Sequence, residues 1–175
     1  MSDELRSERL DLMLFTADLV DAMISEDETT LHAICGARFP GGIIPPLLGD
    51  HLEEQRDMLR ANPESPAWYA WLAIDRERRE AIGSAGGGTI SGDTGRPLIG
   101  WAVYPMYERQ GYGTEAAGAV LAWMLARPGT IAVRATVPVG HVASIRIAEK
   151  IGMQPIGTDV DPEAGPVIVF ERAKP

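Results

Sequence analysis

Alternating hydrophobic and polar positions recur in short segments along the chain, and they predict β-strands. The first such segment is LDLMLF, and segments rich in β-branched and aromatic residues follow it. We expect strands at residues 10–15, 67–74, 81–90, 97–104, 130–137, 155–158 and 165–172. The polar turns DRERRE and SGDTGR separate the three middle strands, which predicts an antiparallel meander.

Other segments place hydrophobic residues three and four positions apart, as amphipathic helices do. We expect two helices within residues 17–35 and further helices at 50–62, 114–126 and 142–151. Gly152 follows the last of these, at a position where glycine often ends a helix. The order of elements predicts the α/β class, with residues 1–175 forming one domain whose mixed sheet of about seven strands is flanked by helices.

The composition is that of an ordinary globular domain and narrows the possible chemistry. Hydrophobic residues make up 45% of the 175 residues and charged residues 23%, close to the usual proportions. Cys35 is the single cysteine, which excludes an internal disulfide or a multi-cysteine metal site and fits a cytoplasmic location. His32 and His51 stand isolated on predicted helices, so we expect no metal site.

The charge is acidic and is concentrated near the start of the chain. The net charge is −9, and residues 1–60 hold 13 of the 25 acidic side chains but 5 of the 16 basic ones. Nucleic-acid binding depends on basic side chains that neutralise phosphates, so we expect no nucleic-acid partner. An acidic surface attracts cationic partners such as amines, although it is also common on soluble proteins.

We expect no membrane association. The opening MSDELRSERL lacks the basic and apolar regions of a secretory signal. The longest uncharged helical segment, residues 116–126, is much shorter than the ~20 residues that span a bilayer.

The loop PMYERQGYG, between the strand at 97–104 and the helix at 114–126, carries the clearest candidate chemistry. Gly111 and Gly113 let the backbone turn tightly, and we expect Thr114 to cap the helix. Backbone N–H groups in such a loop, together with a helix N-terminus, bind anions such as pyrophosphate. An ordinary glycine-rich connection has the same composition, so the loop alone does not decide the function.

Two other phosphate-binding motifs fit less well. A Walker loop needs Gly-Lys followed by Ser or Thr, which occurs nowhere in the chain. GYGTEA matches the G-x-G-x-x-A form of the dinucleotide fingerprint, which needs its first glycine at a strand end and an acidic residue ~20 positions later. Gly111 lies seven positions after Tyr104, and the strand at 130–137 holds no carboxylate. A nucleotide-binding module is therefore the weaker hypothesis.

Three segments carry a combined pattern: SERLDLMLFTADLVD, GWAVYPMYERQGYGTEAAGAVLAWML and ATVPVGHVASIRIAEKIGM. Together they resemble the GNAT acetyltransferases, and within them the branch of ribosomal-protein N-terminal acetyltransferases. The order of elements over residues 8–172 is also similar to that branch. The resemblance implies a GNAT-like fold in which the strand before the loop ends in a bulge and splays from its neighbour, and the pantetheine arm of acetyl-CoA lies in the gap.

The resemblance also implies which residues bind acetyl-CoA. The backbone at the end of the strand at 97–104 pairs with the pantetheine, and an N–H near Val103 polarises the acetyl carbonyl. The expected cofactor contacts are Trp101, Ala102, Val103, Tyr104, Arg109, Gln110, Gly111, Tyr112, Gly113, Thr114, His141 and Ser144.

Two positions depart from the family pattern. Glu108 stands where the family usually has Gln or Arg, and we expect its carboxylate to point away from the pyrophosphate. His141 stands where the family usually has Asn, and it either donates a hydrogen bond to the cofactor or only caps the following helix.

Ser144 and Glu163 are the expected catalytic residues. Ser144 matches the serine that protonates the leaving thiolate in related enzymes, although a serine there also suits a first-turn helix cap. Glu163 lies in the loop between the expected strands at 155–158 and 165–172. It matches a glutamate that related enzymes place in this loop, and it is expected to act as the general base. Asp159 and Asp161 are alternatives in that loop, all three carboxylates could simply be solvated, and a water-mediated base is a further alternative.

The function implied is acetyl-CoA-dependent acetylation of a primary amine, either a protein N-terminus or a small amine compound. We expect the acidic N-terminal third and the loop FPGGIIPPLLG to flank the acceptor. The alternative is a GNAT-fold protein that binds or senses acyl-CoA without transferring the acyl group. A homodimer is compatible with the sequence, which does not determine the oligomeric state.

Overall fold

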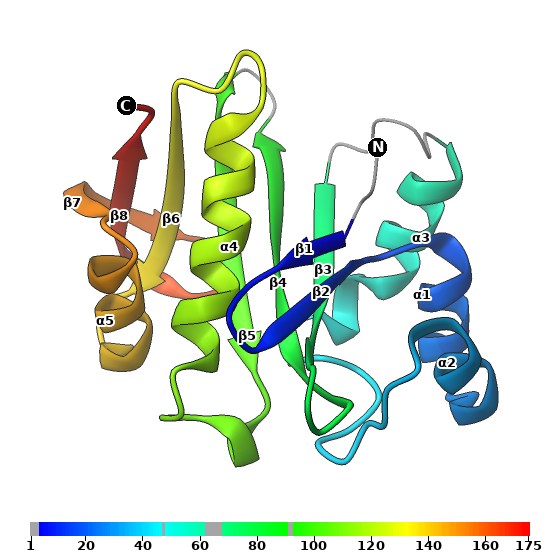
Figure 1. Cartoon of the computed structure of the whole chain (residues 1–175). Helices are drawn as coiled ribbons and strands as arrows, with labels where there is room; N and C mark the ends of the chain where they lie inside the picture. The colour runs from blue at the N-terminus through cyan, green and yellow to red at the C-terminus, as the bar shows by residue number, and fades with distance from the viewer. Residues whose placement is uncertain (1–3, 47, 62–67, 91–92) are drawn as a thin grey trace.

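One mixed sheet of eight strands organises the chain in the computed structural model, which describes residues 4–46, 48–61, 68–90 and 93–175 (Figure 1). The strand order is β1-β2-β3-β4-β5-β6-β8-β7, and every neighbouring pair is antiparallel except β5 and β6. The strands are β1 (Glu4–Arg6), β2 (Leu10–Leu14), β3 (Trp68–Asp75), β4 (Glu80–Ile90), β5 (Asp93–Val103), β6 (Ala132–Pro138), β7 (Gln154–Asp161) and β8 (Gly165–Ala173).

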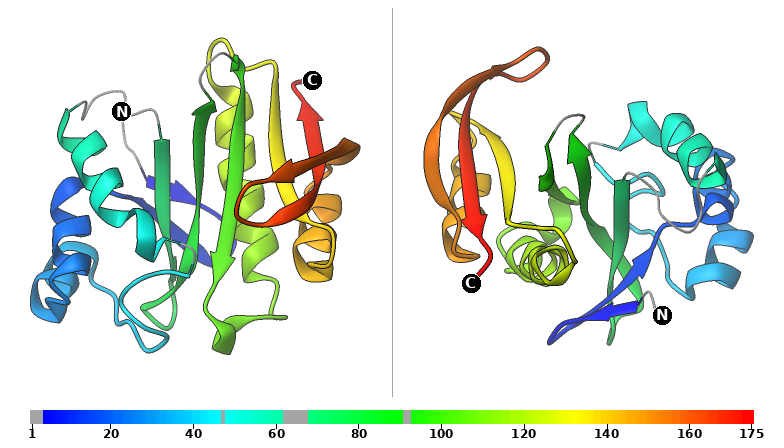
Figure 2. Two further views of the ribbon diagram at one scale, coloured as in Figure 1. Left: turned by 180° about the vertical axis from the view of Figure 1, so that it is seen from behind. Right: turned by 90° about the horizontal axis from the view of Figure 1, so that it is seen from above.

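Helices cover both faces of this sheet. The described helices are α1 (Ala17–Ile24), α2 (Glu28–Cys35), α3 (Leu52–Ala61), α4 (Tyr112–Ala126) and α5 (Val142–Lys150), with short 3₁₀ turns at Gly49–His51 and Pro105–Tyr107. Figure 1 shows α4 and α5 on the face toward the viewer, and the left view of Figure 2 shows α3 in front of β3 on the opposite face. None of the described helices is both long and apolar enough to cross a membrane.

Local sequence signals account for most element boundaries. The Thr16 hydroxyl accepts from the N–H of Leu19 and caps α1, and Asp27 caps α2 through Thr30. The α2 helix ends at Gly36, which adopts a left-handed conformation. These caps explain why the two predicted helices within residues 17–35 form as separate units.

The structure confirms the α/β class and differs from the sequence prediction in detail. The three-residue strand β1 was not expected, so the sheet has eight strands rather than about seven. The α4 helix begins at Tyr112, two residues before the predicted start, and β7 extends beyond the predicted 155–158 at both ends. The predicted ends at residues 62 and 67 lie outside the described residues.

The strands β5 and β6 separate over most of their length. Their one ladder pair among the described residues is Leu98 with Arg134, whereas β6 pairs with β8 along its whole length. The expected bulge at the end of β5 is wrong, because β5 pairs with β4 without interruption from Leu98 to Val103. The register shift lies instead between Gly88 and Ile90 of β4, next to consecutive glycines that tolerate irregular backbone.

Candidate functional site

The N-terminus of α4 presents backbone N–H groups that no helix carbonyl receives. Gly111 precedes the helix with φ 85°, and the first intrahelical bond runs from the N–H of Glu115 to Gly111 O at 3.0 Å. The N–H groups of Tyr112, Gly113 and Thr114 therefore have no backbone partner among the described residues. The expectation that Thr114 caps the helix is wrong, because Thr114 lies inside its first turn and Gly111, which has no side chain, holds the cap position. The uncapped turn retains the donors that favour an anion.

The loop before α4 carries one side chain suited to a phosphate. Arg109 adopts a positive φ of 58°, its side chain is exposed, and no ion pair engages it within the described chain. The amide of Gln110 instead donates to Met106 O at 3.1 Å, so it is already used inside the loop. Glu108 is exposed as well. Of the polar side chains in this loop, Arg109 is therefore the one with a free positive charge.

The end of β5 offers backbone groups to the gap beside β6. The N–H of Tyr104 donates to Ile82 O at 2.9 Å, and Tyr104 O accepts from Tyr107, so both backbone groups of Tyr104 are used within the protein. Backbone polar groups alternate in direction along a strand, so those of Ala102 also face β4. The backbone groups of Trp101 and Val103 face the gap. Of the four strand residues expected to contact the cofactor, these two therefore have backbone groups available to a ligand.

Three elements meet beside this strand end. A Cβ atom added to Gly113 would lie 2.9 Å from Ile147 Cδ1 and 3.3 Å from Val103 Cγ2. Gly113 therefore permits the close packing of α4 on α5 and β5. Ser144 lies three positions before Ile147 on α5 and shares its helix face. The fold thus brings the expected serine to the same junction as Val103 and the free donors of α4.

His141 caps α5, which is one of the two roles expected for it. Its Nδ1 atom accepts from the N–H of Ser144 at 3.2 Å. The half-buried Ser144 hydroxyl makes no hydrogen bond with the described protein. The cap is therefore the imidazole, and the Ser144 hydroxyl remains free for another partner.

The expected base is placed at the turn between β7 and β8. Glu163 is exposed there, and its N–H donates to the carboxylate of Asp161 at 2.9 Å, as does the N–H of Ala164. These two hydrogen bonds lower the pKa of Asp161. Both views of Figure 2 show this turn on the face away from α4. No hydrogen bond joins Glu163 to Ser144 in the described structure, so its role as base stays a prediction.

A pocket of about 470 Å³ lies between α3 and the strands β3, β4 and β5. Most of its lining residues are small or apolar. Of the polar ones, His51 and Glu54 are exposed, and Gln55 and Ser84 are buried. The described lining residues are Pro46, Leu48, His51, Glu54, Gln55, Met58, Ala70, Ser84, Ala85, Gly86, Gly87, Gly100, Trp101 and Ala102. The sequence prediction placed the loop at 39–49 beside an acceptor but did not identify Gln55. Its spacing from Leu52 and Leu59 puts it on the buried stripe of α3, which is the signal that could have found it.

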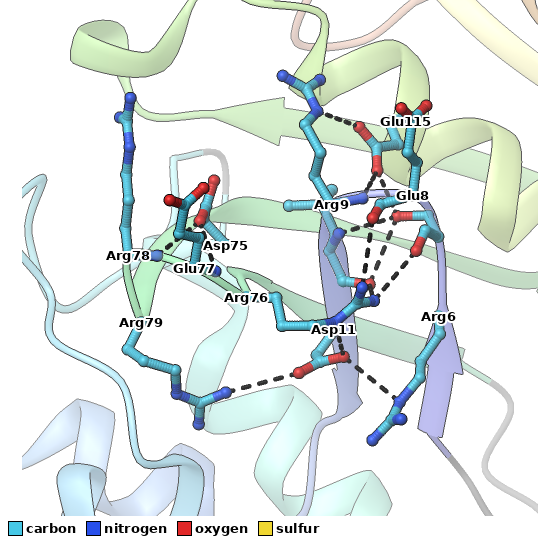
Figure 3. A network of polar contacts seen from close by, with 12 residues as sticks. Arg6, Glu8, Arg9, Asp11, Asp75, Arg76, Glu77, Arg78, Arg79 and Glu115 are labelled. Atoms are coloured by element: carbon cyan, nitrogen blue, oxygen red, sulfur yellow. Dashed lines mark hydrogen bonds and ion pairs between the residues drawn. The ribbon is translucent and has the colours of Figure 1, made fainter.

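A buried carboxylate supports the first turn of α4 from below. Asp75 is 5% exposed, and its Oδ2 accepts from the hydroxyl of Tyr112 at 2.7 Å. Its Oδ1 accepts from the N–H groups of Glu77 and Arg78 (Figure 3). Burial alone would raise the pKa of Asp75, but these hydrogen bonds outweigh it and lower the pKa. Burial and the same contact raise the pKa of Tyr112. The end of β3 is thereby tied to the helix that presents the anion donors.

A second carboxylate ties the same turn to the sheet edge. Glu115 accepts hydrogen bonds from Arg9 (Figure 3) and from the Ser7 hydroxyl. The Arg9 guanidinium also donates to Gln110 O at 3.1 Å. The Arg9 guanidinium lies over the ring of Tyr112 at 4.3 Å. The short hairpin of β1 and β2 therefore holds the loop in place.

Comparison with known proteins agrees with this geometry. Residues 9–154 match the family described as acetyltransferase (GNAT) domain. The chain is 24% identical over 148 residues to YjdG of Bacillus subtilis, an uncharacterized N-acetyltransferase, covering 85% of this chain and 88% of that protein.

Two solved structures share the fold. A GNAT-family acetyltransferase from Bacillus anthracis superimposes with a TM-score of 0.64 at 21% identity, covering 98% of both chains. RimL, a ribosomal L7/L12 alpha-N-protein acetyltransferase in complex with coenzyme A, gives a TM-score of 0.68 at 13% identity, also covering 98% of both chains.

Proposed function

Since this chain belongs to the GNAT acetyltransferase family, we propose that it transfers an acetyl group from acetyl-CoA to a primary amine. The observation that carries the proposal is the junction at Gly113, where α4, β5 and α5 pack within 3.3 Å of the Gly113 Cβ position. One junction thus joins anion donors, a free strand edge and a free hydroxyl. Acetyl-CoA needs all three, because it contains a pyrophosphate, an amide-bearing arm and a thioester.

The residues present fit acetyl-CoA. The N–H groups of Tyr112, Gly113 and Thr114 would receive the pyrophosphate, with Arg109 adding a positive charge. The backbone groups of Trp101 and Val103 would pair with the pantetheine arm as an added strand does. Glu108 lies in an exposed part of the loop, where solvent weakens its repulsion of an anion. Acetyl-CoA supplies the activated acetyl thioester when bound.

The chemistry of acetyl transfer assigns tasks to the chain's own residues. The Val103 N–H is suited to stabilise negative charge on the acetyl oxygen, since Val103 lies opposite Gly83 in the ladder and its N–H is directed away from β4 into the gap. The Ser144 hydroxyl is suited to donate a proton to the leaving thiolate. Glu163, or a water that its carboxylate orders, would take the proton from the attacking amine.

The acceptor amine would enter the pocket beneath α3. Trp101 and Ala102 line the pocket and belong to β5, the strand whose edge would hold the pantetheine. Glu54 brings a negative charge to its wall, and no Lys or Arg lies among the described lining residues. This charge favours an amine over an anionic acceptor. Similarity to RimL supports a protein N-terminus as the acceptor, and the size of the pocket also suits a small amine compound.

The test is product formation followed by mass spectrometry. Purified protein is incubated with acetyl-CoA and a set of N-terminal peptides and small primary amines, and each reaction is examined for a gain of one acetyl group. Acetylated amine together with released CoA would support the proposal. Tight acetyl-CoA binding with no product from any amine would favour the acyl-CoA-binding alternative.

A further inference from the structure

We propose that Gln55 selects the acceptor, and that the acceptor is a primary amine with an apolar body carrying one hydroxyl or N–H donor for the Gln55 carbonyl. This inference rests on the proposed acetyl transfer and goes beyond it by naming the acceptor's chemistry. The shared feature is the donor on an apolar body, whether the amine is a free compound or the first residue of a peptide.

Gln55 is buried without a hydrogen-bond partner. The side chain is 7% exposed, and its Oε1 atom is shielded from solvent and has no hydrogen-bond partner among the described residues. The amide nitrogen also makes no hydrogen bond with a described residue. Buried polar groups are normally satisfied, and an unsatisfied one opposes folding. Gln55 lines the adjoining pocket, so a rotation of its amide about the last side-chain bond would bring the carbonyl within reach of a donor on a ligand there.

Gln55 occupies a position on α3 where an apolar side chain would be expected. Leu52 and Leu59 flank it on the buried stripe of the helix, at 2% and 7% exposure. A leucine or methionine at position 55 would continue that stripe and bury no unpaired amide. The glutamine therefore contributes a hydrogen-bonding group where folding alone favours an apolar side chain.

The opposite wall of the pocket restricts what else the acceptor carries. Ser84, on β4, is 6% exposed, and its hydroxyl has no partner among the described residues. The lining near it is made of Ala70, Gly86, Gly100 and Ala102. Gln55 and Ser84 are thus the buried polar residues of a mostly apolar pocket, whose other polar residues, His51 and Glu54, are exposed. Glu54 is the one acidic side chain among the described lining residues, so a polycation would leave most of its charges unpaired there.

Gly100 gives independent control over the pocket volume. It lies on the pocket wall, and a Cβ atom added there would meet nothing within 4 Å. A Cβ atom at this position therefore displaces no protein atom, and Gly100→Val is the substitution chosen to fill part of the pocket. It should reduce reaction with every acceptor, whereas a change at Gln55 should alter the choice between acceptors.

The test uses two matched pairs of amines whose members differ by one hydroxyl group. Tyramine and phenethylamine are the free amines, and peptides beginning with Ser or Ala, identical otherwise, represent protein N-termini. We expect the wild-type protein to favour the hydroxyl member of at least one pair by about 10-fold or more in kcat/KM. Gln55→Met preserves side-chain length and should bring that ratio close to one. Gln154→Met, the same change at an exposed glutamine of β7, should keep the ratio.

The outcomes separate this inference from the proposed function. Equal kcat/KM within both pairs for the wild type, or a preference that survives in Gln55→Met, overturns the role of Gln55. If acetyl-CoA raises the unfolding temperature but none of the four amines is acetylated, the inferred acceptor class is wrong and acetyl-CoA binding stands. If acetyl-CoA does not stabilise the protein, the proposed function itself fails. A higher unfolding temperature for Gln55→Met than for the wild type would add support, since the unpaired amide is gone.

Discussion

Arg9 and Glu115 lie 106 positions apart in sequence and are joined by two hydrogen bonds. The Arg9 N–H donates to Glu115 Oε1 at 2.6 Å, and its Nε donates to Oε2 at 2.8 Å (Figure 3). Glu115 occupies the first turn of α4, where a carboxylate also interacts favourably with the helix dipole. The pair fixes the helix start whose free N–H groups form the candidate pyrophosphate site.

Replacing Glu115 with Gln should weaken both the fold and the loop. The substitution removes the charge that Arg9 and Ser7 contact, and the loss of such charge-assisted hydrogen bonds typically costs about 1–3 kcal/mol. We expect a lower unfolding temperature and a higher KM for acetyl-CoA. Glu149→Gln, at an exposed position of α5, is the matched control. An unchanged KM in a destabilised Glu115→Gln protein would show that the pair supports the fold without positioning the loop.

The stability of the protein should fall on acidification in a range set by two carboxylates. Burial opposes ionisation of Glu115, but its hydrogen bonds with Ser7 and Arg9 lower its pKa below the ordinary 4.5, and the pKa of Asp75 lies below 3.8. A lowered pKa in the folded state gives stability that is fully present above the ordinary pKa. That stability is lost as the pH falls through the lowered value.

Urea unfolding between pH 7 and pH 3 measures this dependence. The free energy of unfolding should be steady near neutral pH and should fall below about pH 4.5. Glu115→Gln and Asp75→Asn should each show a shallower fall, because each lacks one of the responsible carboxylates. A fall as steep as that of the wild type in both variants would assign the acid sensitivity to other groups.

Removing the Ser144 hydroxyl should slow the chemical step. Ser144→Ala retains the backbone N–H that donates to His141 Nδ1, so the cap of α5 remains intact. General acid catalysis typically contributes about 10²–10⁴-fold, so we expect kcat to fall by at least about 10²-fold, with a much smaller change in acetyl-CoA affinity. Ser25→Ala, which removes an exposed hydroxyl at the end of α1, is the control. An unchanged rate at saturating amine would remove Ser144 as the acid.

A backbone substitution tests the proposed role of the Val103 N–H. That N–H faces away from β4, so Val103→Pro removes a donor from the gap without removing a ladder hydrogen bond. Loss of one such donor typically reduces kcat by about 10²–10³-fold. Val103→Ala retains the donor and corrects for the lost side-chain packing against Gly113. Equal rates for the two variants, with both folded by circular dichroism, would exclude the N–H from catalysis.

Much of the fold could be predicted from the sequence because its pattern is local. The alternation in LDLMLF and the helical spacing in residues 114–126 report which side of each element is buried. The strand β1 was missed because three residues carry too short a pattern, and its pairing with β2 depends on the turn stabilised by Ser7 and Arg9. The absence of a bulge in β5 could not be predicted either, since the position of the register shift depends on how β4 accommodates its glycines.

The candidate site was predictable where it depends on backbone geometry. The loop before α4 and the position of His141 as a cap follow from glycine placement and a strand-to-helix connection. The Val103 N–H faces the gap, whereas the Tyr104 N–H bonds to β4. This difference depends on the register with β4, which the sequence does not encode locally. Gln55 was missed because a polar residue on a charged helix resembles a solvated one until the packing of α3 is known.

Thermal unfolding with separate additions of acetyl-CoA, CoA, NAD and ATP tests the central claim most directly. A ligand at 100 times its Kd should stabilise the folded state by about 2.7 kcal/mol, or roughly 5–11 °C for a domain of this size. We predict a rise of that order with acetyl-CoA, a smaller rise for Arg109→Ala at the same concentration, and none with NAD. A larger rise with NAD, or none with acetyl-CoA, would contradict the assignment of the loop and α4 as a CoA pyrophosphate site.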